Sequence, residues 1–253
     1  MSDLDKIRSA NELTDYLSRI EPPKPGPYRR PRDSATLILL DGAPSEPKVL
    51  LGKRSDRHAF LPGKFVFPGG AIDPSDSRVS VTGMLDPDSQ RRLLHRLARP
   101  SPTRARALAL AAIRETCEET GLLIGQRDGS PNVTPSSAWK PFAEIGLRPN
   151  LAALTYVARA ITPAGRPRRF DARFFVAHRR DIAAELTGIV GPESELVELH
   201  WLSFAEARDT NLPLITRVVL SEIESRLKAD SFARPPVPFY YYLHGRAHRD
   251  EIG

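Results

Sequence analysis

The chain has 253 residues, of which 40% are hydrophobic and 27% charged, a balance typical of a folded globular protein. It contains no run of the roughly 18 apolar residues that cross a membrane, and residues 1–6 lack the basic and then apolar profile of a secretory signal. The single cysteine excludes an internal disulfide, so we expect a cytoplasmic protein.

The charge balance favours an anionic partner. The net charge is +6, from 37 basic and 31 acidic residues, which suits a phosphate-bearing substrate and would also suit nucleic acid. The arginines occur in small groups and not in one block, and this distribution argues against nucleic acid. We therefore expect a small-molecule substrate.

The N-terminal segment, residues 1–33, reads as a helix followed by a linker. Residues 2–20 carry apolar side chains at helical spacing, and the proline-rich residues 21–27 end the helix. We expect the helix to pack on the main domain or on a second subunit, which leaves a homodimer open.

Two strands are predicted next, over residues 35–40 and 48–52. A third hydrophobic stretch ends in Phe67-Pro68-Gly69-Gly70. A glycine pair after a strand allows the backbone to approach a ligand closely. Further on, residues 90–97 are predicted to form a short basic helix with leucines along one side.

The most informative stretch is the helix that ends in Arg114-Glu115-Thr116-Cys117-Glu118-Glu119-Thr120-Gly121. Ser101 can cap its start, with Pro102 as first helical residue and Gly121 as its stop. Three glutamates fall within an arc of about 100° on one face of this helix. Such hard oxygen ligands suit Mg²⁺ or Mn²⁺, whereas the alternative is a solvated, glutamate-rich helix end.

A strand follows from residue 122, and residues 154–162 and 170–177 are predicted to pair as a hairpin. Arg166, Arg168 and Arg169 lie at its turn, where they either reach a substrate phosphate or form a charged tip. An acidic stretch, residues 193–195, precedes a strand with Trp201, and helices are predicted over residues 204–209 and 214–227. The aromatic tail, residues 229–253, either folds back over a pocket or forms an edge strand or subunit contact.

Gly70 together with residues 114–122 resembles the Nudix box, which runs Gly, five residues, Glu, seven residues, then Arg-Glu-U-x-Glu-Glu-x-Gly-U, where U is aliphatic. Thr116 occupies an aliphatic position. The resemblance implies an α/β fold, an α/β/α sandwich around a mixed sheet over residues 34–228, with the box at residues 70–122. It also implies a hydrolase that uses divalent metal to cleave a diphosphate.

The box departs from the family pattern in two ways. Gly70 and Arg114 are 44 positions apart, so about 30 residues are inserted, roughly over residues 74–101. The first glutamate of the box is missing. Counting forward from Gly70 places Asp76 there, and counting back from Arg114 places Arg106 there. Whether Asp76 takes over the role, and whether the insertion walls a pocket, contacts a partner subunit or only decorates the surface, stays open.

The approach to the box and residues 169–175 are similar to the Nudix branch that contains peroxisomal coenzyme A diphosphatases, which also carries a long insertion in the box. This implies coenzyme A or acyl-coenzyme A as substrate. ADP-ribose or another nucleoside diphosphate sugar is the alternative. Two other readings are a nucleotide-binding sensor without turnover, which the missing glutamate favours, and an RNA-directed hydrolase, which no RNA-binding module supports.

The resemblance also implies the roles of individual residues. Metal ligands would be side chains and one backbone carbonyl of the box: Glu115, Glu119, Glu118 and Gly70. Arg114 would orient the carboxylates. The base would be Glu118 or a glutamate from the acidic loop, with Glu195 preferred to Glu193. Substrate contacts are expected from Arg54, Arg57 and Arg169.

Overall fold

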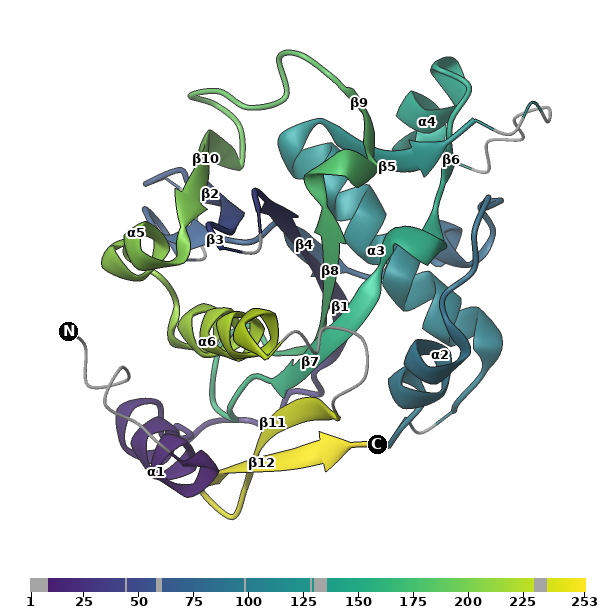
Figure 1. Ribbon diagram of the computed structural model, residues 1–253. Coiled ribbons are helices and arrows are strands. Elements are labelled where there is room, and N and C mark those ends of the chain that lie inside the picture. Colours follow the sequence, from purple (N-terminus) through teal and green to yellow (C-terminus); the bar gives the residue numbers. More distant parts are fainter. Residues whose placement is uncertain are drawn as a thin grey trace.

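The computed structural model describes residues 9–43, 45–57, 61–97, 99–127, 129, 136–229 and 236–253 (Figure 1). The helices of these residues are α1 (Ala10–Ile20), α2 (Pro87–Leu93), α3 (Pro102–Thr120), α4 (Lys140–Glu144), α5 (Phe204–Asp209) and α6 (Leu214–Lys228). The strands are β1 (Arg32–Asp41), β2 (Lys48–Arg54), β3 (Phe65–Val66), β4 (Gly69–Ala71), β5 (Leu122–Gln126), β6 (Arg148–Pro149), β7 (Thr155–Ile161), β8 (Phe170–His178), β9 (Ile182–Glu185), β10 (Leu196–Ser203), β11 (Val237–Leu243) and β12 (Arg246–Ile252).

A mixed sheet forms the centre of the molecule. Its strand order is β10-β2-β1-β8-β7-β11-β12, with short β3 and β4 paired to β2 and β1. β1 and β8 are parallel, whereas β8 and β7 form the predicted antiparallel hairpin. A smaller sheet has the order β6-β5-β9. The predicted mixed α/β fold is thus confirmed.

Each face of the large sheet has its own hydrophobic core. Along β1, Leu37 and Leu39 point to the core beneath α3, while Ile38 and Leu40 point to the core beneath α6, as the alternation of side chains along a strand requires. Figure 1 shows α3 and α6 on opposite sides of the sheet, with α1 on the α6 side. This is the sandwich that the sequence implied.

The helix α3 begins and ends where the sequence predicted. The Ser101 side chain accepts a hydrogen bond from the Arg104 N–H, and proline occupies the first turn. Gly121 ends the helix with φ of 77°, a left-handed conformation that glycine adopts without a steric penalty. These local signals place the three glutamates on the last turns of the helix.

Two helices differ from their predicted bounds. The helix of the insertion starts earlier than predicted, because Asp86 caps the N–H of Ser89 and Pro87 opens the first turn. It ends at Leu93. Helix α1 begins at Ala10 with Ser9 as cap, and residues 2–8 of the longer predicted helix lie outside the described residues.

In the part of the chain that the structure describes, no helix combines the length and the apolar character that a membrane span requires.

The aromatic tail joins the large sheet. β11 pairs with β7 in parallel and β12 forms the outer strand of a hairpin, so the edge-strand prediction is confirmed. Helix α1 covers this hairpin, since the Tyr242 hydroxyl donates to the Leu17 carbonyl and the Ala247 N–H donates to Ser18 Oγ. Helix α1 and the C-terminal hairpin therefore pack against each other.

Candidate functional site

A glycine pair and the end of α3 form the centre of the candidate site. Gly70 pairs with Ala35 of β1, and a Cβ placed on Gly70 would come within 2.4 Å of the Glu115 carboxyl carbon. A larger residue at this position would force the Glu115 carboxylate to move. The Gly69 N–H donates to Glu119 Oε2 at 3.1 Å. Two of the three box glutamates thus face the glycine bend, as predicted.

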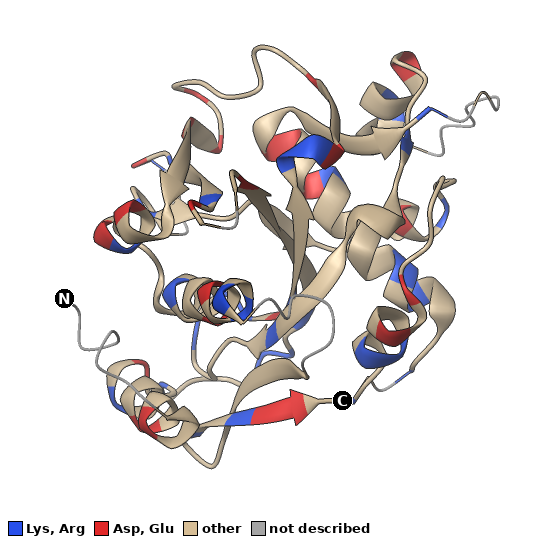
Figure 2. Ribbon diagram, viewed as in Figure 1, with Lys and Arg blue, Asp and Glu red and all other residues tan. Residues whose placement is uncertain are grey.

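Arg114 organises the carboxylates around it. Its guanidinium donates to both oxygens of Asp76, from Nε at 2.9 Å and Nη2 at 3.2 Å. Nη1 donates to Glu115 at 2.8 Å and to Glu118 at 2.9 Å, and Nη2 also bonds the Ala71 carbonyl. Figure 2 shows acidic and basic residues side by side on these last turns of α3. Burial lowers the pKa of Arg114, but the hydrogen bonds and charges of Asp76 and Glu115 outweigh this and raise it, so the guanidinium stays charged.

Asp76 occupies the position that the sequence left open. Its side chain is fully buried, and besides Arg114 it accepts the Asp73 N–H at 2.8 Å, which closes a capping box on the 3-10 helix Pro74–Ser77. The 3-10 turn brings this carboxylate, shorter than the glutamate of the family pattern, within hydrogen-bond distance of Arg114.

Glu119 is the most deeply buried of the box glutamates, with 8% of its surface exposed. Burial raises its pKa well above the ordinary value, and the nearby charges of Glu195 and Glu115 raise it further. Burial likewise raises the pKa of Glu115 and of Glu118, which Arg114 partly offsets. Glu195 comes from the loop before β10, and Arg54 Nη1 holds its carboxylate at 2.8 Å.

These residues fit a divalent cation. Most of their side chains offer carboxylate oxygens, which are hard donors. Besides burial, repulsion by Glu195 and Glu115 raises the pKa of Glu119, and a bound cation would offset that repulsion. Among the residues that the structure describes, no three His, Cys, Asp or Glu side chains are grouped as they would be around a metal ion. Glu115 and Glu118 each accept a hydrogen bond from Arg114 Nη1 instead.

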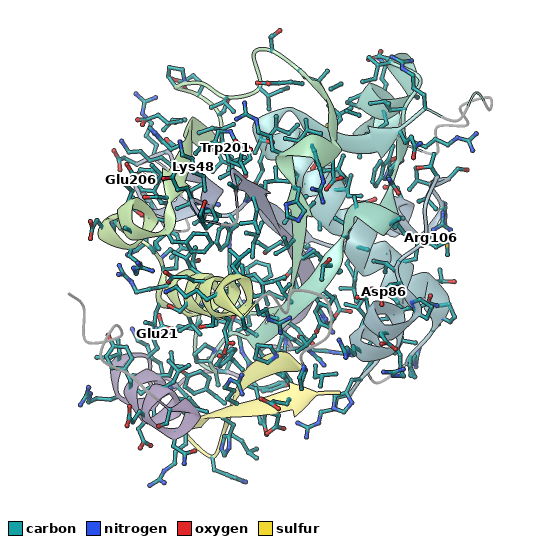
Figure 3. All side chains as sticks on the ribbon, in the orientation of Figure 1. Glu21, Lys48, Asp86, Arg106, Trp201 and Glu206 are labelled. Carbon is teal, nitrogen blue, oxygen red and sulfur yellow. The ribbon has the colours of Figure 1, made fainter. Side chains whose placement is uncertain are left out.

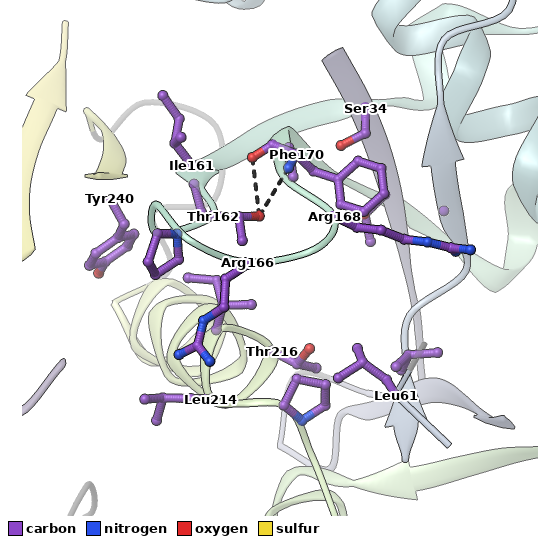
Figure 4. A pocket seen from close by; sticks show the side chains of 18 of the residues that line it. Ser34, Leu61, Ile161, Thr162, Arg166, Arg168, Phe170, Leu214, Thr216 and Tyr240 are labelled. Atoms are coloured by element: carbon purple, nitrogen blue, oxygen red, sulfur yellow. Dashed lines mark hydrogen bonds between the residues drawn. The ribbon is translucent and has the colours of Figure 1, made fainter. Parts of the chain in front are cut away.

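A pocket of about 400 Å³ opens from the glycine pair on the α6 side of the sheet. Its wall combines residues of β7, β8 and β11 with the start of α6, and its lining is mainly apolar. Arg54, Gly69 and Gly70 line it near the carboxylates, and Glu21, Arg166 and Arg168 line it near the β7–β8 turn (Figure 4). The described residues of the insertion are not part of this lining.

The three arginines predicted to contact substrate have different places. Arg54 is 7% exposed, lines the pocket and bonds Glu195. Arg57 has 80% of its side chain exposed and pairs with the equally exposed Glu193. Arg169 does not line the pocket: it donates to the carbonyls of Thr162 and Arg29, and it holds the N-terminal segment against the turn. Its placement does not support the predicted substrate contact.

The insertion lies apart from the pocket rim. In Figure 3, Asp86 of the insertion and Arg106 of α3 lie on one side of the molecule. Glu21, which lines the pocket, and Trp201 lie on the other side. Arg106 donates to the Val79 carbonyl, and Leu93 is buried in the core beneath α3. The insertion therefore supports α3 and supplies Asp76.

The aromatic tail both forms an edge hairpin and lines the pocket, so the two options left open for it by the sequence both apply. Tyr240 and Tyr242 alternate along β11 toward the pocket, and Thr162 lines it from the end of β7. The order Phe-Tyr-Tyr-Tyr after prolines signalled an aromatic strand, but its partner β7 is about 80 positions away in the sequence. Pairing over such a separation leaves no local signal.

Comparison with known proteins gives related sequences and one clear structural likeness. No family model matches the chain. It is 30% identical over 92 residues to the uncharacterized Nudix hydrolase NudL of Yersinia enterocolitica, covering 36% of this chain and 47% of that protein. It is 26% identical over 206 residues to the acyl-coenzyme A diphosphatase NUDT19 of Gallus gallus, covering 57% and 54%. The chain thus spans about half the length of these curated relatives.

A solved structure covers more of the chain. The NUDIX hydrolase of Alicyclobacillus acidocaldarius superposes with a TM-score of 0.57 at 26% identity, over 82% of this chain and all of that one. A likeness over 82% of the chain is not confined to the box.

Proposed function

We propose that the chain is a Nudix hydrolase, as its likeness to Nudix relatives supports, and that it is a divalent-metal-dependent diphosphatase that acts on coenzyme A or acyl-coenzyme A. The observation that carries the proposal is the carboxylate cluster at the glycine bend: Glu115 lies against Gly70, Glu119 accepts the Gly69 N–H, and Glu195 lies close to Glu119. Such a cluster suits Mg²⁺ or Mn²⁺.

The residues would share the work as follows. Glu115, Glu119, Glu118 and the Gly70 carbonyl would hold the ion, which when bound neutralises phosphate charge and acidifies water. Arg114 orients Glu115 and Glu118 through Nη1. Glu195 is the preferred base, because it lies beside Glu119 with Arg54 fixing it at the pocket, and Glu118 is the alternative.

The choice of coenzyme A rests on two supports. One is the printed activity of the chicken relative, an acyl-coenzyme A diphosphatase. The other is the largely apolar pocket that adjoins the carboxylates and carries arginines at its rim. Cleavage of the diphosphate by water would give adenosine 3′,5′-bisphosphate and a phosphopantetheine, with each product keeping one phosphorus of the broken anhydride.

A substrate panel tests the proposal. Coenzyme A, an acyl-coenzyme A, ADP-ribose, a dinucleotide and capped RNA are incubated with Mg²⁺, with Mn²⁺ and with EDTA, and products are separated by chromatography. We expect the two coenzyme A products with metal and none with EDTA. Glu119→Gln should abolish turnover, and Glu144→Gln, an exposed glutamate of α4 paired with Lys140, should leave it unchanged.

Other outcomes discriminate between the alternatives. Cleavage of ADP-ribose in preference to coenzyme A would assign the nucleoside diphosphate sugars instead. Tight binding of a nucleotide without any product would identify a sensor, and release from capped RNA would identify an RNA-directed hydrolase. Each of these results contradicts the coenzyme A proposal.

A further inference from the structure

The end of the pocket remote from the carboxylates carries a charge that hydrolysis of a diphosphate does not need. Arg166 lies on the β7–β8 turn and lines the pocket. In Figure 4 its side chain extends from the turn toward Leu214 at the start of α6. Among the described residues it has no hydrogen bond or ion pair, unlike Arg169 on the same turn, which donates to two carbonyls.

The turn that presents Arg166 is anchored. Thr162 Oγ1 accepts the Phe170 N–H at 3.0 Å across its base. The Lys24 N–H donates to the Ala164 carbonyl at 3.0 Å, and a Cβ on Gly165 would lie 1.9 Å from the Lys24 carbonyl oxygen. Only glycine allows the N-terminal segment to press this closely on the turn. The backbone at Arg166 is therefore fixed in advance of ligand binding, which lowers the part of the entropy cost that comes from ordering the turn.

The separation between the two ends suits a single nucleoside. Gly70 pairs with Ala35 of β1, and Phe170, at the base of the turn, pairs with Arg32 on the other side of β1. The path from Gly70 to Phe170 therefore runs three residues along β1 and two strand spacings across the sheet. The rise per residue and the spacing between strands give a separation of about 14 Å. An arginine that reaches inward from the turn leaves space for one base and its sugar between the guanidinium and the carboxylates.

The chemistry of the wall distinguishes the two halves of the substrate. The acyl-pantetheine half has amides and a hydroxyl but no anionic group, so it offers an arginine no charged partner at the rim. The nucleoside half has an aromatic base, which suits the apolar wall and the adjacent Tyr240 and Tyr242, and it carries a separate ribose phosphate, which suits a guanidinium. Glu21 on the same rim would repel a second anion placed beyond Arg166.

We propose that this pocket receives the nucleoside half of the substrate and that Arg166 binds its ribose 3′-phosphate, so that the site selects nucleotides phosphorylated at the ribose. This rests on the proposed function, since the diphosphate must lie at the glycine pair. Arg166 is then a specificity-determining residue remote from the reacting atoms.

Equilibrium binding tests the assignment without any turnover. The dissociation constants of adenosine 3′,5′-bisphosphate and of AMP are measured by titration calorimetry for the full chain and for Arg166→Gln, Arg166→Lys and Arg180→Gln. Arg180 is exposed and does not line the pocket. We expect the bisphosphate to bind about tenfold to a hundredfold more tightly than AMP, as a charge-assisted hydrogen bond provides. Arg166→Gln should remove this preference, Arg166→Lys should restore part of it, and Arg180→Gln should keep it.

The assignment would be overturned if wild type bound the two nucleotides with equal affinity or bound neither of them. It would also be overturned if Arg166→Gln weakened the binding of both nucleotides by the same factor. An unchanged circular dichroism spectrum of Arg166→Gln controls for folding. Because no diphosphate is cleaved here, the result is separate from the substrate panel: coenzyme A hydrolysis without a bisphosphate preference would leave the enzyme proposal standing and reject the role of Arg166.

Discussion

Asp76 shows how one side chain can take over a position that the sequence pattern leaves vacant. The buried carboxylate receives two bonds from Arg114 and one from the Asp73 N–H. A family pattern that demands glutamate cannot reveal this, because the answer depends on where the insertion begins. The 3-10 turn directly after the glycine bend decides it, and turns of this kind are poorly specified by sequence.

Replacing Asp76 by asparagine should destabilise the protein strongly. Asparagine keeps the cap on the Asp73 N–H but leaves the buried Arg114 short of one carboxylate, and loss of one partner from a buried pair costs about 3 kcal/mol or more. Urea unfolding measures the change. Asp88→Asn removes an exposed pair with Arg91 and should cost less than about 1 kcal/mol. Equal unfolding midpoints for Asp76→Asn and wild type would refute the anchoring role.

Glu119 makes stability depend on pH when divalent ions are removed. Burial raises its pKa in the folded protein above the unfolded value, so its protonated form favours folding at low pH. That contribution is lost as pH rises through the raised pKa. The variant Glu119→Gln has no ionisable side chain at this position. In EDTA, its free energy of unfolding minus that of wild type should therefore increase from pH 5 to pH 9. Unfolding free energies across this range check the sign, and a flat or falling difference would speak against it.

At the scale of elements, local signals predicted best. Both ends of α3 follow from Ser101, Pro102 and Gly121, and α5 has the bounds predicted for it. The β7–β8 hairpin follows from two hydrophobic runs around a turn. The small sheet of β5, β6 and β9 was not predicted, since its strands are short and pair across long separations.

The insertion supports α3, and its described residues do not line the pocket. Leu93→Ala should lower stability by about 2 to 4 kcal/mol, because Leu93 is 1% exposed in the core beneath α3. The kcat/KM of the folded variant should stay unchanged. Met84→Ala, at a side chain of the insertion that is 61% exposed, should change stability by less than about 0.5 kcal/mol. A selective loss of activity in Leu93→Ala, without loss of stability, would assign the insertion to the site instead.

Across the whole molecule, the site is assembled from segments that the sequence keeps far apart. The carboxylates come from α3 and the loop before β10, the glycine pair from β4, and the pocket wall from β7, β8, β11 and the start of α6. The helical half of the box could be recognised because residues 114–122 are contiguous. The other walls of the pocket could not be assigned, because β7, β8 and the start of α6 reach it only through tertiary packing.

Capture of a hard cation by the carboxylates at the glycine bend is tested most directly by a Mn²⁺ titration followed by electron paramagnetic resonance, which detects the free ion. Wild type and Glu144→Gln should bind Mn²⁺ with the same affinity, and Glu115→Gln and Glu119→Gln should each bind it at least about tenfold more weakly, as loss of one charged ligand implies. Failure of wild type to bind Mn²⁺, or equal binding by all four proteins, would contradict a metal site at Gly70.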